Sequence, residues 1–226
     1  MPIGYEINDL AKEESWRIFR LIGELVEGFD KLSGIAPAVT IYGSARIKPG
    51  DELYEQTTDI ARRLGELGFS IITGGGPGVM EAANKGAKEA GVTSVGLNIE
   101  LPEEQCPNPY ATKSITFNHF FIRKVMLVKY ATAFVIMPGG LGTMDELTEV
   151  LTLIQTNKIN PFPVILFNSG FWRGFLDWLQ NTVLIPGYIS ESDLHLLRIS
   201  DQPEDVQNIV SSWYLRQAIT GRRAID

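Results

Sequence analysis

The sequence predicts an α/β protein with a doubly wound, mostly parallel, Rossmann-like sheet. Short apolar runs alternate along the chain with amphipathic stretches of ten or more residues, a pattern typical of strands joined by helices. Several of the apolar runs end in glycine-rich loops that lead into the next helix. The 226 residues include 44% hydrophobic ones, enough for a core of ordinary size. We therefore expect a single main domain.

We expect an N-terminal helical extension at residues 1–36, a Rossmann-like main domain at 37–215 and a tail at 216–226. Residues 5–33 carry apolar side chains at helical spacing, and Gly28 and the pair Ser33-Gly34 are expected to end that helix. We interpret its apolar stripe as a packing or oligomer contact rather than a membrane anchor.

The strands and helices then follow in order. AVTIY at 38–42 is closed by glycine and leads into the amphipathic ELYEQTTDIARRLGELG, whose last glycine suits a helix C-cap. The later pairs are FSIIT with VMEAANKGAKEAG, TSVGLNI, SITFN with HFFIRKVMLVKYA, FVIM with LGTMDELTEVLTLIQTNK, and PVILF with FWRGFLDWLQNTVL. No internal repeat interrupts this order.

Three glycine loops predict a phosphate site. YGSAR at 42–46, TGGGPGVME at 73–81 and PGGLGTMDE at 138–146 all follow expected strands, where parallel sheets bind ligands. Glycine lets backbone amides turn toward a ligand, and a helix N-terminus adds free N–H groups. The candidates are Gly43, Ser44, Gly75, Gly76, Gly139, Gly140, Gly142 and Thr143, the last as a helix cap or a phosphate donor. One such loop could be a plain tight turn, but three favour a site.

Neither main loop has the glycine spacing of a dinucleotide-binding or P-loop motif, which disfavours an NAD-linked dehydrogenase and a P-loop ATPase.

The net charge of −7 argues against nucleic-acid backbones and anionic membranes as partners. A single cysteine and the lack of a signal-peptide pattern predict a cytoplasmic protein. His119, His195 and Cys106 do not form a zinc-site pattern, so we expect no metal.

An acidic protein must hold an anion with a local cation, and Arg123 is the best candidate. It lies among the apolar residues Phe120, Phe121, Val125, Met126 and Leu127, which we expect to crowd around it. A guanidinium there could grip a phosphate or carboxylate, or stack on a base. Asp145 and Glu146 start the helix after the third loop, where they either stabilise the helix dipole or serve the chemistry beside a bound phosphate.

PGGLGTMDE, RKVM at 123–126 and GGGPGVME together resemble the LONELY GUY family of cytokinin riboside 5′-monophosphate phosphoribohydrolases, over about residues 39 to 184. The resemblance implies cleavage of a nucleoside 5′-monophosphate to free base and ribose 5-phosphate, without metal or cofactor, by a homodimer or larger homo-oligomer. It implies Arg123 and Glu146 as the catalytic pair. The implied substrate contacts are Met80, Gln105, Lys124, Gly140, Leu141, Gly142, Thr143, Met144, Asp145 and Thr152.

The sequence departs from the plant enzymes at Asp145, at residues 78–81 and at Gln105, where the family has a glutamate. These positions surround the expected base end of the site, so AMP or a related purine monophosphate is a safer prediction than a cytokinin precursor. A second hypothesis is a non-catalytic carrier of a nucleotide or of the molybdenum cofactor, because related folds carry that cofactor. A third, a decarboxylase, would need a lysine bound to pyridoxal phosphate, for which Lys124 is the candidate.

Overall fold

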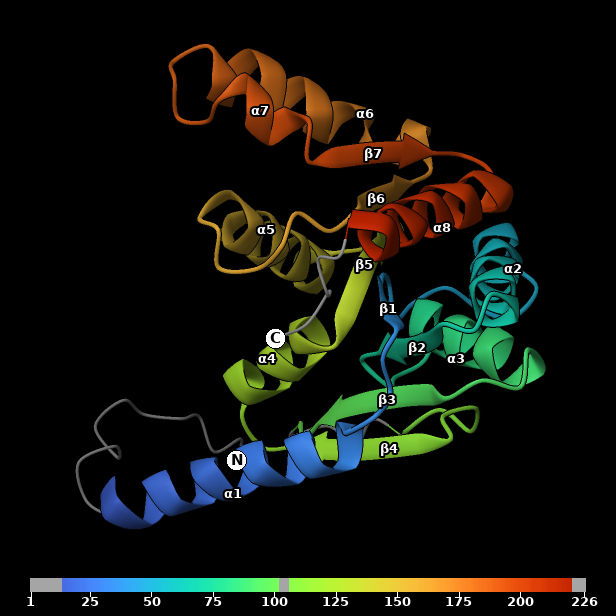
Figure 1. Ribbon diagram of the computed structural model, residues 1–226, viewed down its shortest axis with the longest axis vertical. Coiled ribbons are helices and arrows are strands. Elements are labelled where there is room, and N and C mark those ends of the chain that lie inside the picture. Colours follow the sequence, from blue (N-terminus) through green and yellow to red (C-terminus); the bar gives the residue numbers. More distant parts are fainter. Residues whose placement is uncertain (1–13, 102–105, 221–226) are drawn as a thin grey trace.

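The computed structural model describes residues 14–101 and 106–220. Its centre is a parallel sheet in the order β4-β3-β2-β1-β5-β6-β7, as Figure 1 shows. The strands are β1 (Ala38–Tyr42), β2 (Ser70–Thr73), β3 (Ser94–Ile99), β4 (Lys113–Phe117), β5 (Ala131–Ile136), β6 (Val164–Phe167) and β7 (Leu197–Ser200). Each neighbouring pair is parallel, which confirms the predicted fold class.

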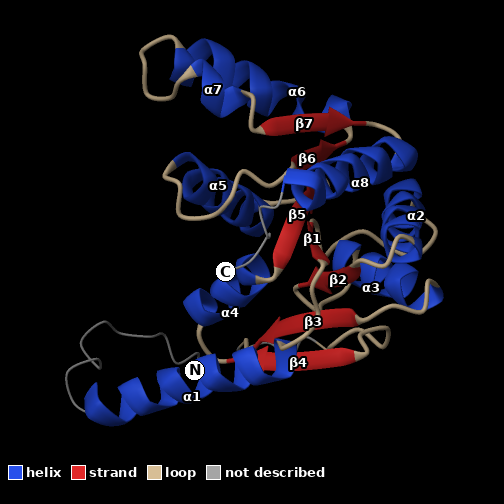
Figure 2. Ribbon diagram, in the orientation of Figure 1, coloured by secondary structure: helices blue, strands red, loops and turns tan. Residues whose placement is uncertain are grey.

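Helices cover both faces of the sheet (Figure 2). One face carries α2 (Glu52–Glu66), α3 (Val79–Glu89) and α8 (Pro203–Thr220). The other carries α1 (Glu14–Leu32), α4 (Phe120–Lys129), α5 (Leu141–Gln155) and α6 (Ser169–Trp178). A π-helical turn, η2 (Leu179–Leu184), continues α6, and α7 (Glu191–Leu194) precedes β7. The helix expected at the end of the PVILF unit is therefore α6 with η2.

The two faces of the sheet divide each strand's side chains between two cores. In β1, Val39 and Ile41 join the core beneath α2, α3 and α8, whereas Ala38 and Tyr42 join the core beneath α1, α4, α5 and α6. Successive side chains of a strand point to opposite faces, so a strand covered on both sides is apolar throughout. This explains the continuous apolar runs in the sequence.

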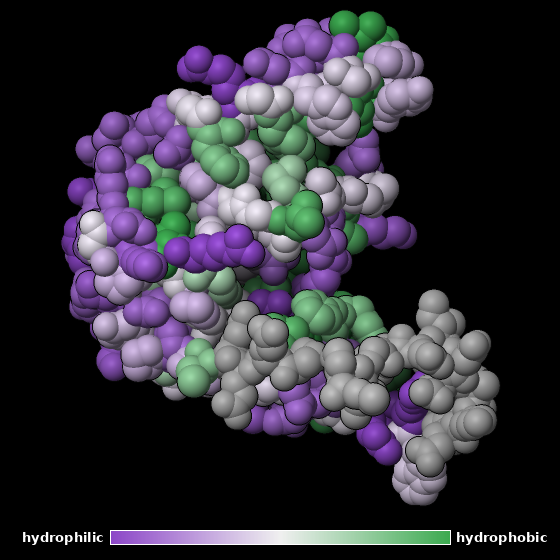
Figure 3. Space-filling view, turned by 180° about the vertical axis from the view of Figure 1, so that it is seen from behind, coloured by the Kyte–Doolittle hydropathy of each residue, from purple (hydrophilic) through white to green (hydrophobic). Residues whose placement is uncertain are grey.

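Helix α1 passes through Gly28 instead of ending there, so that part of the expectation was wrong. A Cβ atom at Gly28 would lie 2.7 Å from the Cε atom of Met126, which shows that this glycine allows α1 to approach α4 closely. The helix ends at Leu32, before the expected Ser33-Gly34 pair, and Gly34 has a φ of +77°. In Figure 3 the outline of the molecule is hollowed between the end that carries α6 and α7 and the end that carries α4.

The sequence pattern did not reveal the elements after residue 184. Strand β7 adds an edge to the sheet, and α8 returns across the face that holds α2. Helix α8 extends to Thr220, so residues 216–220 of the expected tail are helical. Within the described ranges, no helix is long and apolar enough to cross a bilayer.

Candidate active site

The three glycine loops lie together at the carboxyl edge of the sheet. Strands β1 to β4 are added outward in sequence order, and β5 then returns to the other side of β1. The strand order therefore reverses between β1 and β5, the kind of place where such sheets bind ligands. The loops at 42–46, 73–81 and 137–146 follow β1, β2 and β5, the three central strands.

Backbone contacts join these loops to one another. The amide of Ser44 donates to the carbonyl of Pro138 at 3.0 Å, and the amide of Val79 donates to the carbonyl of Ser44 at 2.9 Å. A Cβ at Gly43 would lie 2.7 Å from the methyl groups of Val79. Gly78 has a φ of +71°, and its Cβ would lie 2.4 Å from the Ser44 carbonyl oxygen. Glycine is therefore required at both positions for the loops to fit together.

The loop after β2 is held from behind by buried amides. The side chain of Asn108 donates to the carbonyls of Gly75 and Gly76, both at 3.1 Å, and to Oδ1 of Asn84 at 2.9 Å. The Gly75 amide donates to the hydroxyl of Thr73 at 3.0 Å. No periodic pattern in the sequence marks Asn84 or Asn108, because each contributes through a single polar side chain.

The N-terminus of α5 faces this edge without a side-chain cap. The helix starts at Leu141, and its N-cap residue is Gly140, which has extended backbone geometry. The capping role considered for Thr143 is not found; Thr143 is buried, and a Cβ at Gly139 would lie 2.1 Å from its Oγ1 atom. The first amides of a helix lack partners within it, so an anion here would meet backbone N–H groups.

Arg123 projects from α4 and is fixed by backbone carbonyls. Its Nε donates to the carbonyl of Leu97 at 2.7 Å, and its Nη2 lies 3.4 Å from the carbonyl of Gly74. Of the neighbours that were expected to crowd around it, Phe120 and Phe121 are more than half exposed, whereas Met126 and Leu127 are buried. Burial lowers the pKa of the Arg123 guanidinium, whereas the charge of Glu146 raises it.

Glu146 is a half-buried acid in the first turns of α5. Burial raises the pKa of its carboxyl from 4.5 to about 7, although the Arg123 guanidinium acts in the opposite direction. Asp145 beside it adds a further upward contribution to that pKa. A carboxyl with a pKa near 7 populates both protonation states at neutral pH, which suits a group that exchanges protons with water.

Tyr42 is a third member of this cluster that the sequence analysis missed. It ends β1, is 3% exposed and stacks on Phe134 with ring centroids 6.3 Å apart. Burial raises the pKa of its hydroxyl well above 10.0, and the charge of Glu146 adds to that effect. The available signal was its place as the last strand residue before the glycine of YGSAR.

Lys124 points the other way and pairs with the two remaining acids of α5. Its Nζ lies 3.0 Å from Asp145 Oδ2 and 3.3 Å from Glu149 Oε2. Burial lowers the pKa of Lys124, but the hydrogen bond to Asp145 and the charge of Glu149 outweigh this and the net pKa is raised. Asp145 is thus engaged in an exposed ion pair, whereas Glu146 is not.

The remaining expected contacts surround this centre at different distances. Met80 packs beneath the second loop, since a Cβ at Gly74 would lie 2.7 Å from its Sδ. Thr152 is further along α5, donates its hydroxyl to the Thr148 carbonyl at 2.7 Å and lines a hollow of about 270 Å³ with Asp145 and Glu149. Gln105 lies outside the described residues.

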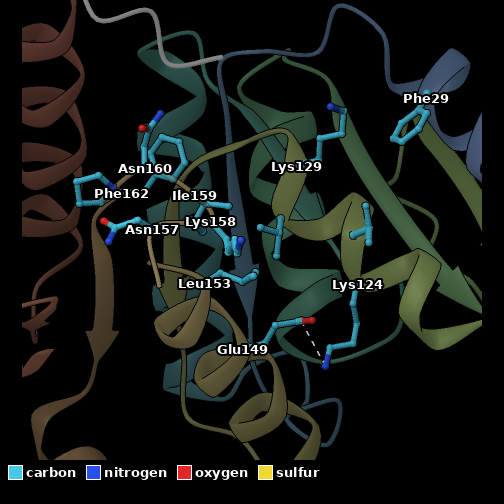
Figure 4. A pocket seen from close by; sticks show the side chains of 13 residues that line it. Phe29, Lys124, Lys129, Glu149, Leu153, Asn157, Lys158, Ile159, Asn160 and Phe162 are labelled. Atoms are coloured by element: carbon cyan, nitrogen blue, oxygen red, sulfur yellow. Dashed lines mark ion pairs between the residues drawn. The ribbon is translucent and has the colours of Figure 1, made fainter. Parts of the chain in front are cut away.

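A larger hollow of about 710 Å³ lies between α4, α5 and the segment before β6 (Figure 4). Lys124 and Glu149 stand at one end of it, and Phe29, Lys129 and Phe162 line it further away. It does not include the glycine loops, so the volume alone does not mark the site. In the part of the chain that is described, no three histidine, cysteine or acidic residues are grouped to hold a metal ion.

Comparison with known proteins fits this arrangement. The family model described as "possible lysine decarboxylase" matches residues 80–210. The cytokinin riboside 5′-monophosphate phosphoribohydrolase LOG of Oryza sativa is 30% identical over 142 residues, which are 61% of this chain and 57% of the rice protein. The chain thus matches little more than half of that relative's length.

The cytokinin riboside 5′-monophosphate phosphoribohydrolase of Mycobacterium marinum is 27% identical over 68% of this chain and 83% of its own length. Among solved structures, the molybdenum cofactor binding protein of Rippkaea orientalis superposes with a TM-score of 0.58 at 21% identity, over 77% of this chain and 94% of its own. At that identity the likeness extends only to the fold. The chain belongs to the possible lysine decarboxylase family, which is the LONELY GUY family, and is a distant relative of its phosphoribohydrolases.

Proposed function

We propose that this protein hydrolyses the N-glycosidic bond of a purine nucleoside 5′-monophosphate, with AMP as the first substrate to test. The observation that carries the proposal is a backbone-fixed arginine whose charge acts on a half-buried glutamate of raised pKa beside the glycine loops. The distant relatives named as phosphoribohydrolases support the same reaction class. The products would be the free base and ribose 5-phosphate.

The phosphate would be bound by amides at the start of α5 and in the interlocked loops. Its binding energy, realised away from the reacting bond, would hold the ribose against Glu146. Cleavage of such bonds passes through a transition state that resembles an oxocarbenium ion, which a nearby carboxylate stabilises. The oxygen of water bonds to C1′ as the bond to the base breaks. Ionised Glu146 receives one proton from that water and later releases it to solvent, while the departing base nitrogen takes up one proton from solvent, so that the net reaction consumes one water.

Arg123 would act mainly through its charge. With two nitrogens directed at the carbonyls of Leu97 and Gly74, the guanidinium cannot turn freely, and it lies where its charge lowers the pKa of Glu146. It therefore opposes the effect of burial and keeps part of the Glu146 population ionised at neutral pH. The same positive charge would favour a phosphorylated sugar in a protein with a net charge of −7.

The experiment is incubation with AMP and a direct assay for adenine and ribose 5-phosphate. We expect Glu146→Gln to lower kcat by about 10²- to 10⁴-fold, the range for loss of a general acid–base group, with nucleotide binding retained. Asp145→Asn is the matched control, because Asp145 is the adjacent acid but is exposed and paired with Lys124. The absence of base release from any common nucleoside monophosphate would refute the proposal.

The alternative is a protein that binds a phosphorylated ligand at the same glycine loops without cleaving it. The observation that favours this alternative is the shared fold of the molybdenum cofactor binding protein of Rippkaea orientalis. Stoichiometric retention of a phosphorylated ligand without product would support it. The decarboxylase suggested by the family description fits poorly, because a Schiff-base lysine needs a lowered pKa and the pKa of Lys124 is raised.

We also propose a homodimer or larger homo-oligomer. Helix α1 carries a row of large apolar side chains at helical spacing that stay exposed among the described residues: Trp16, Phe19, Ile22, Val26 and Phe29. An exposed apolar row of this kind is typical of a protein interface. A monomer by light scattering at assay concentration would overturn this proposal. A cytoplasmic location stays a prediction from the sequence.

A further inference from the structure

Helix α1 touches α4, the helix that carries Arg123, along the whole length of α4. Before α4 begins, the carboxylate of Glu24 meets Asn118 and His119. In the middle, Gly28 packs against Met126, where no Cβ fits without a shift. At the end of α4, Lys129 lies over the ring of Phe29, 5.3 Å from its centroid. Helix α1 precedes residues 80–210, the range that the family model matches, whereas α4 lies within that range.

Glu24 is the polar anchor of this contact. Its Oε1 accepts from Asn118 Nδ2 at 2.8 Å and lies 3.1 Å from His119 Nδ1, and its Oε2 accepts from the Asn118 amide at 3.3 Å. The carboxylate is only 12% exposed, so water competes little for these bonds. His119 is the N-cap residue of α4, but its side chain makes no capping hydrogen bond with the first amides of that helix. The carboxylate therefore fixes the start of α4 from a different helix.

Arg123 lies one turn after this anchor. Its amide donates to the His119 carbonyl at 3.2 Å, so a displacement of His119 moves the backbone of Arg123. The guanidinium tolerates little movement, because its bond to Leu97 is 2.7 Å long and its contact with Gly74 is already 3.4 Å. We propose that Glu24 is a positioning residue that holds α4, and through it the Arg123 guanidinium, in register with Glu146. This inference rests on the proposed hydrolase function and adds α1 to the working enzyme.

The variants are Glu24→Ala, which removes every acceptor, and Glu24→Gln, which keeps an oxygen for the Asn118 amides. Glu27→Ala is the matched control. Glu27 lies on the same helix, is about half exposed and pairs only with Lys31 of its own helix among the described contacts. All three proteins and the wild type are compared well below their melting temperatures, so that unfolding does not enter the rates.

We expect Glu24→Ala to lower kcat for AMP about tenfold or more, because a displacement of about 1 Å at a reacting group can cost a hundredfold. KM should change little, since the glycine loops do not touch α1 in any described contact. Glu24→Gln should recover most of the loss, and Glu27→Ala should behave as the wild type. An unchanged kcat in Glu24→Ala would overturn the inference.

The pH profile gives a readout that a merely structural role would not alter. The guanidinium of Arg123 lowers the pKa of Glu146, so its withdrawal should raise that pKa further. The acidic limb of kcat/KM should then move to higher pH in Glu24→Ala and stay in place in Glu27→Ala. A drop in rate with no movement of the limb would count against positioning of Arg123.

A third measurement needs no activity. Phenylglyoxal labels arginine side chains, and the labelled Arg123 peptide is counted by mass spectrometry. Glu24→Ala should label Arg123 faster than the wild type or Glu27→Ala; equal rates would refute the inference. If the wild type cleaves no nucleotide, the proposed function fails while this arm still decides the position of Arg123. If the wild type is active but the Glu24 variants match it in all three readouts, only the positioning role fails.

Discussion

Replacing Glu146 should stabilise the folded protein at alkaline pH. The native carboxyl has a pKa of about 7, against 4.5 when it is unperturbed. The native state therefore binds more protons than the unfolded chain between these values, and stability falls as the pH rises from 4.5 to 7. At about 1.36 kcal/mol for each pKa unit, the ionised carboxyl costs about 3 kcal/mol above pH 8 and almost nothing below pH 4.5. Glu146→Gln removes this pH-dependent cost.

The assay is thermal unfolding of the wild type, Glu146→Gln and Asp145→Asn across pH 5 to 8. For a chain of this size about 3 kcal/mol corresponds to about 6 to 12 °C in Tm. The advantage of Glu146→Gln over the wild type should grow by that amount across the range. Asp145→Asn should show a smaller growth, because it keeps the Glu146 carboxyl and removes only the upward contribution of the Asp145 charge to its pKa. A Tm difference that stays constant with pH would refute the assignment of a raised pKa to Glu146.

Three further experiments test the packing of the fold and of the glycine loops. Gly78→Ala should lower the free energy of unfolding by more than Gly91→Ala, which should cost about 1 to 3 kcal/mol for strain alone. Both glycines have positive φ, +71° and +75°, but only a Cβ at Gly78 meets the Ser44 carbonyl, and urea unfolding measures the difference. In α1, a Cβ at Gly23 meets nothing within 4 Å, so Gly23→Ala should stabilise the protein by about 0.5 to 1 kcal/mol. Gly28→Ala should destabilise it, because the added Cβ meets Met126. A higher Tm for Gly28→Ala than for Gly23→Ala would contradict this packing. Asn108→Ala removes the hydrogen bonds to the carbonyls of Gly75 and Gly76 and should weaken AMP binding, which calorimetry measures. An unchanged affinity would show that these hydrogen bonds are not needed to hold the loop.

Much of the fold was visible in the sequence because local patterns determine it. Buried parallel strands are apolar throughout, and glycine punctuates the turns into helices, so the order of elements from β1 to α6 could be predicted. Strand β7 was not predicted, because it lies at an edge of the sheet and its middle residues, Arg198 and Ile199, are exposed, so it lacks a continuous apolar run. The stop expected at Gly28 was misplaced because the glycine serves contact with another helix, which local sequence does not encode.

The candidate site also divides into residues that local motifs reveal and residues that only the three-dimensional contacts reveal. The glycine loops, Arg123 and Glu146 of the candidate site stand in contiguous motifs and could be predicted from the sequence. Tyr42, Asn108 and Glu24 were not, because each acts across a large sequence separation through one side chain. The opposite environments of Asp145 and Glu146 also required the structure, since helix geometry turns adjacent side chains in different directions.

The interlocking of the glycine loops limits how this site can be redesigned. Gly43 and Gly78 leave no room for a Cβ against a neighbouring loop, so a side chain added at one loop displaces another, and a Cβ at Gly139 would meet Thr143 of its own loop. The loops act as one unit that accepts change only as a whole. Thr148 and Thr152, by contrast, are exposed on regular helix beside the same site and bond only to their own backbone turn. Libraries that seek a new base preference should vary this rim of α5 and leave the loops untouched.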